Sequence, residues 1–296
     1  YTGTTYKLAK MNLAIRGISA NLGDKAANTF SDDQHKDLKA DYIMANPPFN
    51  QKDWRADDEL LDDPRWRGYD VPPKSNANYG WILNMASKLS VNGVAGFILA
   101  NGALSGGGEE YKIRRKLIEN DLVEAILVLP QNMFYTTNIS VTLWILNRNK
   151  KERAVLVGNE QRQYRNRERE ILFMDLRQMG EPFEKKFTQF SPADIERITS
   201  IYHNWQCTAP RRGEACPRPY QNTPELCYSA SFEEIVKKDF SLVPSKYIEF
   251  INRDEQIDFD EKMKALQAEF KELLQAEEQS KQELLTVFKN LGYEIK

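Results

Sequence analysis

The sequence has few cysteines, few histidines and no long apolar run. Only three of its 296 residues are cysteine, too few for the disulfide framework of a small secreted protein, so we expect a reducing, cytoplasmic setting. Two histidines leave no histidine-rich site, and we predict no bound metal. The longest apolar run, Val94–Ala100, is far shorter than the roughly 20 residues of a membrane span, so we expect no membrane association.

The chain also lacks an initiating methionine and any basic or apolar leader, since it begins at Tyr1. We therefore expect it to be truncated at its N-terminus. A hydrophobic content of 41% excludes wholesale disorder. The net charge of −2 conceals an asymmetry, because residues 254–296 hold 11 acidic and 6 basic residues. The acidity is thus concentrated in one C-terminal segment.

Apolar strands alternate with helices through the first half of the chain. The predicted strands are 41–45, 93–100, 122–129 and 140–146, and the predicted helices are 4–18, 79–89 and 109–120. Since these strands are apolar without alternation, they predict an α/β fold with a parallel-type sheet covered on both faces. We assign residues 1–150 to this domain.

Residues 151–240 are predicted to form an accessory extension. Two short strands, Ala154–Val157 and Ile171–Asp175, are expected to flank a hairpin loop. The stretch 148–170 has eight basic residues against four glutamates. The arginines of 162–169 could meet phosphates, but the interleaved glutamates favour a solvated hairpin tip.

Residues 241–296 are predicted to end in a helix for subunit packing. Its apolar positions step by three and four residues, at Phe259, Met263, Leu266, Phe270, Leu273, Leu284, Val287 and Leu291. This spacing is typical of a coiled-coil or bundle helix. Such a helix could pack on its own domain or dock a partner, and the polar seam positions Glu277 and Ser280 favour the partner.

The sharpest chemical signal is Asn46-Pro47-Pro48-Phe49, directly after a predicted buried strand. Ligands of open α/β sheets bind at the carboxyl ends of strands. The prolines fix the backbone, so the Asn46 side chain and the Pro47 carbonyl offer two acceptors to one amino group. Phe49 offers a ring on which a planar base could stack. The pattern predicts a pocket for a heterocycle with an exocyclic amine, whereas the simpler alternative is a proline turn.

Beyond this tetrapeptide, the chain resembles the modification subunits of type I restriction-modification enzymes, which are N6-adenine DNA methyltransferases. The resembling segments span nearly the whole chain: Thr5–Leu13, Lys39–Asn50, Asn76–Trp81, Gly93–Gly102, Leu129–Phe134 and Ser245–Tyr247. The tetrapeptide alone is shared with glutamine and ribosomal RNA methyltransferases, so the composite carries the resemblance.

The resemblance implies a Rossmann-like fold that binds S-adenosyl-L-methionine beside a flipped-out adenine. Asn46 and Pro47 would accept hydrogen bonds from the adenine N6 amine, Pro48 would belong to the same catalytic stretch, and methyl transfer would be direct. Phe49 would stack on the flipped base, and Phe134 would pack on it from another side unless it is a core aromatic. The implied partners are DNA, a specificity subunit, a second modification subunit and a restriction (nuclease) subunit.

The chain departs from the family pattern at the cofactor site. An acidic residue commonly stands where this sequence has Asn28, so Asn28 and Thr29 would make only a weak contact with the cofactor's adenine, or form a plain loop. The family's glycine-rich cofactor loop would lie before Tyr1, and Gly106–Gly108 fits neither a dinucleotide nor a P-loop fingerprint. We therefore expect this chain alone to be inactive, with an exposed edge at Asp41–Ala45. The alternative function is an inactive fragment that serves only as a partner- or DNA-binding scaffold.

Overall fold

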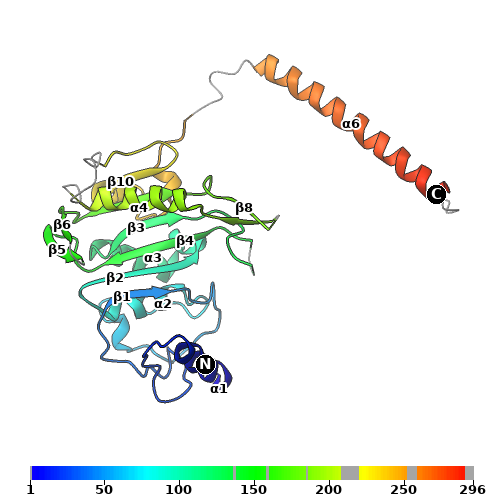
Figure 1. The fold of residues 1–296 in the computed structure, drawn as a ribbon. Coiled ribbons are helices and arrows are strands. Elements are labelled where there is room, and N and C mark those ends of the chain that lie inside the picture. Colours follow the sequence, from blue (N-terminus) through cyan, green and yellow to red (C-terminus); the bar gives the residue numbers. More distant parts are fainter. Residues whose placement is uncertain are drawn as a thin grey trace. The chain divides into compact units, whose positions relative to one another are not determined.

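The computed structural model describes residues 2–135, 138–157, 160–184, 186–207, 220–251 and 259–290. They form two compact units, residues 1–249 and residues 250–296. The first unit is built on one six-stranded sheet (Figure 1). Its strands lie in the order β1 (Ala40–Ala45), β2 (Leu89–Ala100), β4 (Val141–Asn147), β3 (Val123–Val128), β7 (Glu170–Asp175) and β10 (Cys227–Ser231). Strands of the proposed accessory extension thus belong to the same sheet as the strands before residue 150.

Four strands of this sheet, β1, β2, β3 and β7, run in one direction, whereas β4 and β10 run against them. The predicted parallel sheet is therefore wrong for β4. The described residues between β3 and β4 include no helix, and an antiparallel neighbour needs no helical crossover. The α/β fold class itself is confirmed.

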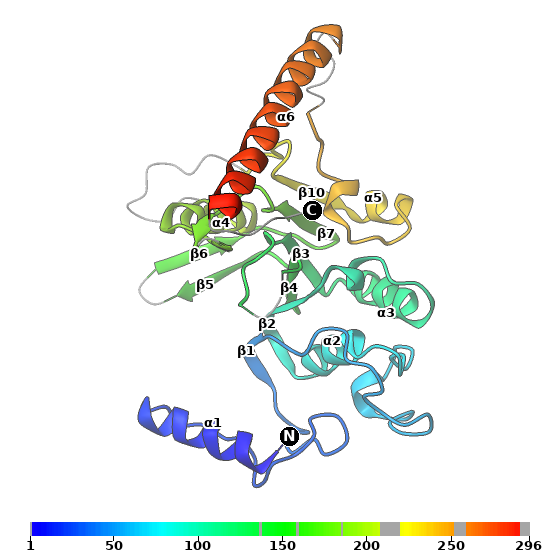
Figure 2. The same ribbon diagram turned by 90° about the vertical axis from the view of Figure 1, so that its right-hand side faces the viewer.

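Helices cover the sheet unevenly. Figure 2 shows α2 (Asn78–Ser87), α3 (Gly108–Glu119) and α5 (Phe232–Lys237) on one side and α4 (Pro192–Gln206) on the other. The first group buries Ile82, Leu117 and Trp144 in one apolar cluster, and α4 buries Trp205 in a second. The central strand β3 is buried at every position, which explains why all its residues except Glu124 are apolar.

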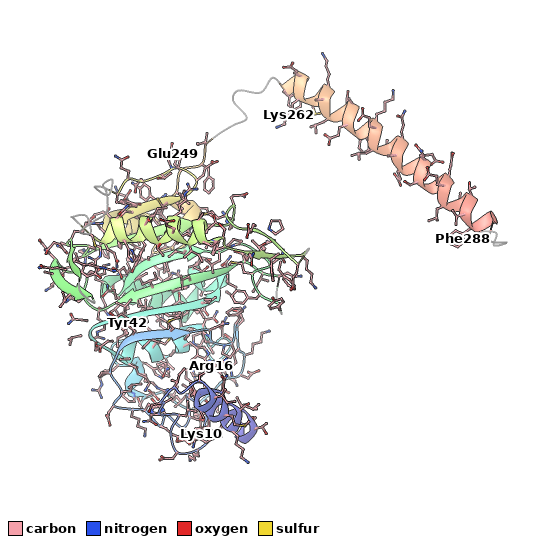
Figure 3. All side chains as sticks on the ribbon, viewed as in Figure 1. Lys10, Arg16, Tyr42, Glu249, Lys262 and Phe288 are labelled. Carbon is pink, nitrogen blue, oxygen red and sulfur yellow. The ribbon has the colours of Figure 1, made fainter. Side chains whose placement is uncertain are left out.

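The sheet is open at β1, which is an edge strand as predicted. Tyr42 and Met44 are 82% and 93% exposed, and Figure 3 labels Tyr42 at this end of the sheet. The expected covering of both faces is therefore wrong at β1. The first helix, α1 (Gly3–Ile15), also buries none of its residues. Exposed edges with apolar side chains favour pairing with another strand.

Two hairpins and three short helical turns complete the first unit. The hairpins are β5 (Arg153–Val157) with β6 (Glu160–Tyr164), and β8 (Glu181–Phe183) with β9 (Phe187–Gln189). The turns are η1 (Pro64–Trp66), η2 (Asn101–Leu104) and η3 (Pro244–Lys246). The predicted pairing across residues 154–175 is wrong, because β5 pairs with β6 while β7 joins the main sheet.

The predicted solvated arginine run is also wrong at its centre. Arg167 is 0% exposed and its Nε lies 3.1 Å from Glu124 Oε1, also buried. Arg165 pairs with Glu170 at 2.7 Å. Because a buried charge needs a partner and hydrogen bonds, these arginines hold the start of β7 against β3 and α4 and are not available to phosphates.

In the second unit, the described residues form the helix α6 (Phe259–Asn290). Its apolar residues are largely exposed, as Phe270 and Val287 are at 63% and 56%. The last predicted seam position, Leu291, lies outside the described residues. Among the residues that the structure describes, no helix has the length and apolarity to cross a membrane.

Candidate target-base site

Asn46 and Pro47 directly follow β1, at the carboxyl end of that strand. Since β1, β2, β3 and β7 are parallel, the segments that follow them all lie at this end of the sheet. Asn46 is exposed, Pro47 is buried and Phe49 is half-buried. Neither the Asn46 side chain nor the Pro47 carbonyl accepts a hydrogen bond from the described residues. Both acceptors that the sequence pointed to are therefore free of hydrogen bonds within the described structure.

The turn after Phe49 is held by the start of α2. Asn50 has a φ of 51°, a left-handed conformation that asparagine tolerates better than most residues. Its Oδ1 accepts from Asn78 Nδ2 at 2.9 Å, and its N–H donates to Asn78 Oδ1 at 3.1 Å. The Ala77 N–H donates to the Gln51 carbonyl at 2.9 Å. Asn78 is only 1% exposed, so these bonds fix the turn in a water-poor place.

The two aromatic candidates lie on one side of the sheet. Phe49, after β1, and Phe134, after β3, both pack against the apolar cluster that contains Leu129 and Val141. Both rings are half-buried, so each keeps surface on which a ligand could lie. Their roles toward a base stay predictions.

The predicted cofactor segment is held by hydrogen bonds and aromatic packing and lies against the same helix. Asn28 Oδ1 accepts from the Phe30 N–H at 2.9 Å. Phe30 is buried between the rings of Trp54 and Trp81, each 4.4 Å away between centroids. A Cβ on Gly80 of α2 would lie 3.2 Å from the Trp54 ring, so glycine permits this close packing.

Arg65, which the sequence analysis did not single out, clamps this segment. Its guanidinium donates to the carbonyls of Thr29 and Phe30 at 2.8 and 2.5 Å and pairs with Asp63 at 2.7 Å. Burial alone would raise the pKa of Asp63, but the hydrogen bonds from Arg65 bring that pKa below its usual value. With Arg65 using the backbone carbonyls, the Asn28 amide nitrogen and the Thr29 hydroxyl remain without hydrogen bonds in the described structure.

The first turns of α2 therefore bring the two predicted pieces to one helix. Asn78 holds the turn that follows the amine acceptors, and Gly80 and Trp81 support the segment with Asn28 and Thr29. The sequence predicted no role for Asn78 beyond its place in a resembling segment. Its hydrogen-bond partner Asn50 is 28 residues away, so the pair cannot be seen in a local pattern.

Gly106–Gly108 is built differently from a phosphate-binding loop. Arg114 Nη1 donates to the Gly106 carbonyl at 2.7 Å, and the Glu110 carboxylate occupies the space beside Gly106. A carboxylate at this helix start opposes a bound phosphate. Across the described residues, no group of three or more His, Cys, Asp or Glu side chains is placed to hold a metal.

The structure thus has an open α/β sheet with two unbonded acceptors and a half-buried aromatic ring at the end of one strand. The model of the N-6 DNA methylase family matches residues 1–256, and the chain belongs to this family. The resemblance drawn from the sequence is confirmed.

Named relatives agree with this assignment. The chain is 38% identical to the HindI methylase subunit of a type I restriction enzyme from Haemophilus influenzae, over 99% of this chain and 61% of that protein. It is 33% identical to the MjaIX methylase subunit from Methanocaldococcus jannaschii, over 97% of this chain and 48% of that protein. The chain thus spans about half to three fifths of these curated relatives.

A solved structure agrees as well. The type I restriction-modification methyltransferase subunit from Streptococcus thermophilus superimposes with a TM-score of 0.69 at 26% identity, covering 84% of this chain and 47% of that one. The α/β fold class is therefore shared with a methyltransferase subunit.

Proposed function

We propose that the full-length protein methylates the N6 amine of adenine in DNA, as the methylase subunit of a type I restriction-modification system. The observation that carries this proposal is the pair of open acceptors, Asn46 Oδ1 and the Pro47 carbonyl, at the end of β1. Each accepts one N–H of an exocyclic amine, which turns the nitrogen lone pair out of conjugation with the ring. The Asn50–Asn78 hydrogen bonds hold the turn, so little reorganisation is needed when the base arrives.

Access to this site requires the base to leave the double helix. A stacked adenine presents its amine within the groove, whereas the acceptors lie at a strand end beside Phe49. A flipped base would stack on Phe49, with Phe134 on another side, and such stacking contributes about 1–3 kcal/mol per base. Pro47 and Pro48 keep the backbone of the site extended and rigid.

The methyl donor is proposed to be S-adenosyl-L-methionine, which supplies an electrophilic methyl group. The residues present fit its adenine end, because the Asn28 amide nitrogen and the Thr29 hydroxyl have no hydrogen-bond partner in the described structure. Arg65 holds the backbone carbonyls of Thr29 and of the next residue, Phe30. These residues would orient the donor's adenine, and the amine acceptors need no metal.

Assembly is proposed to run through α6. Its exposed apolar side chains, such as Phe270, Leu273 and Val287, are suited to pack against helices of a specificity subunit or of a second copy. A restriction subunit would join that assembly. The alternative, an inactive fragment that binds only partners or DNA, keeps the same acceptors and the same helix.

The function is tested in the full-length protein assembled with its partner. Asn46→Ala is expected to abolish transfer of tritiated methyl groups to a target oligonucleotide while assembly and overall DNA affinity stay nearly intact. Phe49→Ala is expected to weaken the flipped state. Asn92→Ala serves as the control, because Asn92 is exposed near the start of β2, at the opposite edge. Near-normal turnover by Asn46→Ala would overturn the assigned role.

A further inference from the structure

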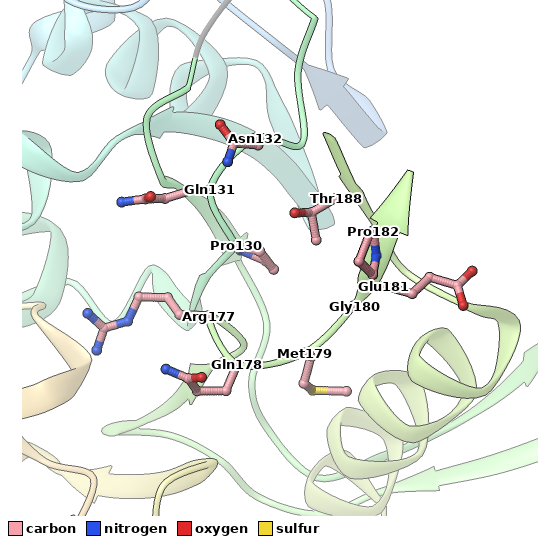
Figure 4. A pocket seen from close by; sticks show the side chains of 10 residues that line it. All are labelled: Pro130, Gln131, Asn132, Arg177, Gln178, Met179, Gly180, Glu181, Pro182 and Thr188. Atoms are coloured by element: carbon pink, nitrogen blue, oxygen red, sulfur yellow. The ribbon is translucent and has the colours of Figure 1, made fainter. Parts of the chain in front are cut away.

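A pocket at the carboxyl ends of β3 and β7 has no role in the mechanism above. Its volume is about 480 Å³, within the range of about 300–1,000 Å³ that is usual for ligand sites. Figure 4 shows its lining: Pro130, Gln131, Asn132, Arg177, Gln178, Met179, Gly180, Glu181, Pro182 and Thr188. The first three residues follow β3 and the next three follow β7, so the pocket lies at the same sheet edge as Asn46.

The wall of this pocket is tied to the loop that carries Phe134. The Thr188 N–H donates to the Asn132 carbonyl at 3.0 Å, and the Tyr135 ring meets the Phe187 ring edge-on at 4.7 Å. The β8–β9 hairpin is therefore docked on the loop after β3. A ligand in the pocket would contact the same loop that presents Phe134.

The pocket is lined by carboxamides without hydrogen bonds and by charged groups of both signs. The side chains of Gln131, Asn132 and Gln178 make no hydrogen bonds within the described structure. Figure 4 shows Gln131, Arg177 and Gln178 extending to the same side of the loop. Asp175 holds the Arg177 guanidinium through Nε and Nη2 and leaves Nη1 open.

This chemistry favours a nucleobase over a phosphate. Asp175 offsets the charge of Arg177, and the Glu181 carboxylate also lines the pocket, so the site does not concentrate positive charge. Carboxamides both donate and accept, and Gln, Asn and Arg are the side chains that read base edges in pairs of hydrogen bonds. A phosphate would instead select a cluster of cations.

We propose that this pocket binds the edge of a DNA base that flanks the target adenine. The proposal rests on the proposed function, which brings DNA to this edge of the sheet. The bound neighbour would hold the strand while the target base occupies the site beside Asn46 and Phe49. It would also make methylation depend on the identity of that flanking base.

The test uses the full-length methylase in complex with its specificity partner. Target duplexes carry 5-iododeoxyuridine at single positions on either side of the target adenine, and irradiated peptides are mapped. A crosslink from one flanking position to residues 130–132 or 177–182 is expected. The double variant Gln131→Ala/Gln178→Ala should lose that crosslink and bind the target roughly tenfold more weakly, as expected for one lost paired contact. Gln163→Ala in the β5–β6 hairpin, distant from β8 in Figure 1, should retain both.

The outcomes separate this proposal from the proposed function. Crosslinks only to other peptides, with methylation intact, would overturn the pocket and leave the function standing. An equal loss of affinity for target and unrelated DNA would also overturn it, because that pattern belongs to backbone contacts. Absence of methyl transfer by the unmodified complex would instead reject the function.

Discussion

Removal of the Asn78 side chain tests whether the turn after Phe49 sets the rate of methyl transfer. Asn78→Ala deletes two hydrogen bonds to Asn50, of 2.9 and 3.1 Å. Asn78 itself is only 1% exposed. At about 0.5–1.5 kcal/mol for each bond, the loss is roughly 1–3 kcal/mol. If all of this free energy served to position the acceptors in the transition state, kcat would fall about 5- to 160-fold. Freed from Asn78, Asn50 would also leave its φ of 51° easily.

The assay compares Asn78→Ala with Asn147→Ala in the full-length complex. Asn147 is also buried and makes two hydrogen bonds, to Glu124 and to the Asn149 N–H, at the opposite edge of the sheet. Both variants should lose thermal stability, and Asn147→Ala at least as much, since one of its bonds goes to the buried Glu124 carboxylate. Only Asn78→Ala should lower kcat, with KM for DNA changed less. Full turnover by folded Asn78→Ala would refute the idea that this turn positions the acceptors.

Three further predictions concern other parts of the chain. Burial alone would raise the pKa of Asp33, but its bond to Lys88 brings that pKa below the usual value. The stabilisation is therefore complete above the unfolded pKa of about 3.9 and is lost as pH falls through the folded pKa. In urea unfolding, the free energy of unfolding of the unmodified chain should exceed that of Asp33→Asn, and this difference should shrink below about pH 4. A difference that does not change with pH would contradict this. Deletion of residues 254–296 should leave a soluble unit that no longer co-purifies with the specificity subunit in size exclusion, and an intact complex would contradict a docking role for α6. By calorimetry, this chain alone should bind S-adenosyl-L-methionine much more weakly than the full-length protein, because Asn28 and Thr29 reach only the adenine end. Micromolar binding by this chain would show that the cofactor site is misplaced.

Local patterns in the sequence placed Asn46 to Phe49 directly after a strand, and the structure has that strand as β1, although it is not buried. The roles of these residues toward a base stay predictions. The exposed edge at β1 followed from the resemblance, and the structure has it. In each case the determining residues are adjacent along the chain or belong to one strand.

Long-range pairings could not be predicted in the same way. The Asn50–Asn78 pair spans 28 residues and the Glu124–Arg167 pair spans 43. A run rich in arginine and glutamate resembles a solvated surface in sequence, and only the position of Glu124 in β3 reveals that Arg167 is buried. The reversed direction of β4 has the same origin, because its direction depends on which strands it lies between.

The central claim is that the acceptors at the end of β1 serve the exocyclic amine of adenine in DNA. The most direct measurement is a nucleoside analysis by mass spectrometry of target DNA incubated with the full-length complex and isotopically labelled methyl donor. We expect the label to appear as N6-methyldeoxyadenosine and Asn46→Ala to remove it. Label on cytosine, or unchanged adenine methylation by Asn46→Ala, would contradict it.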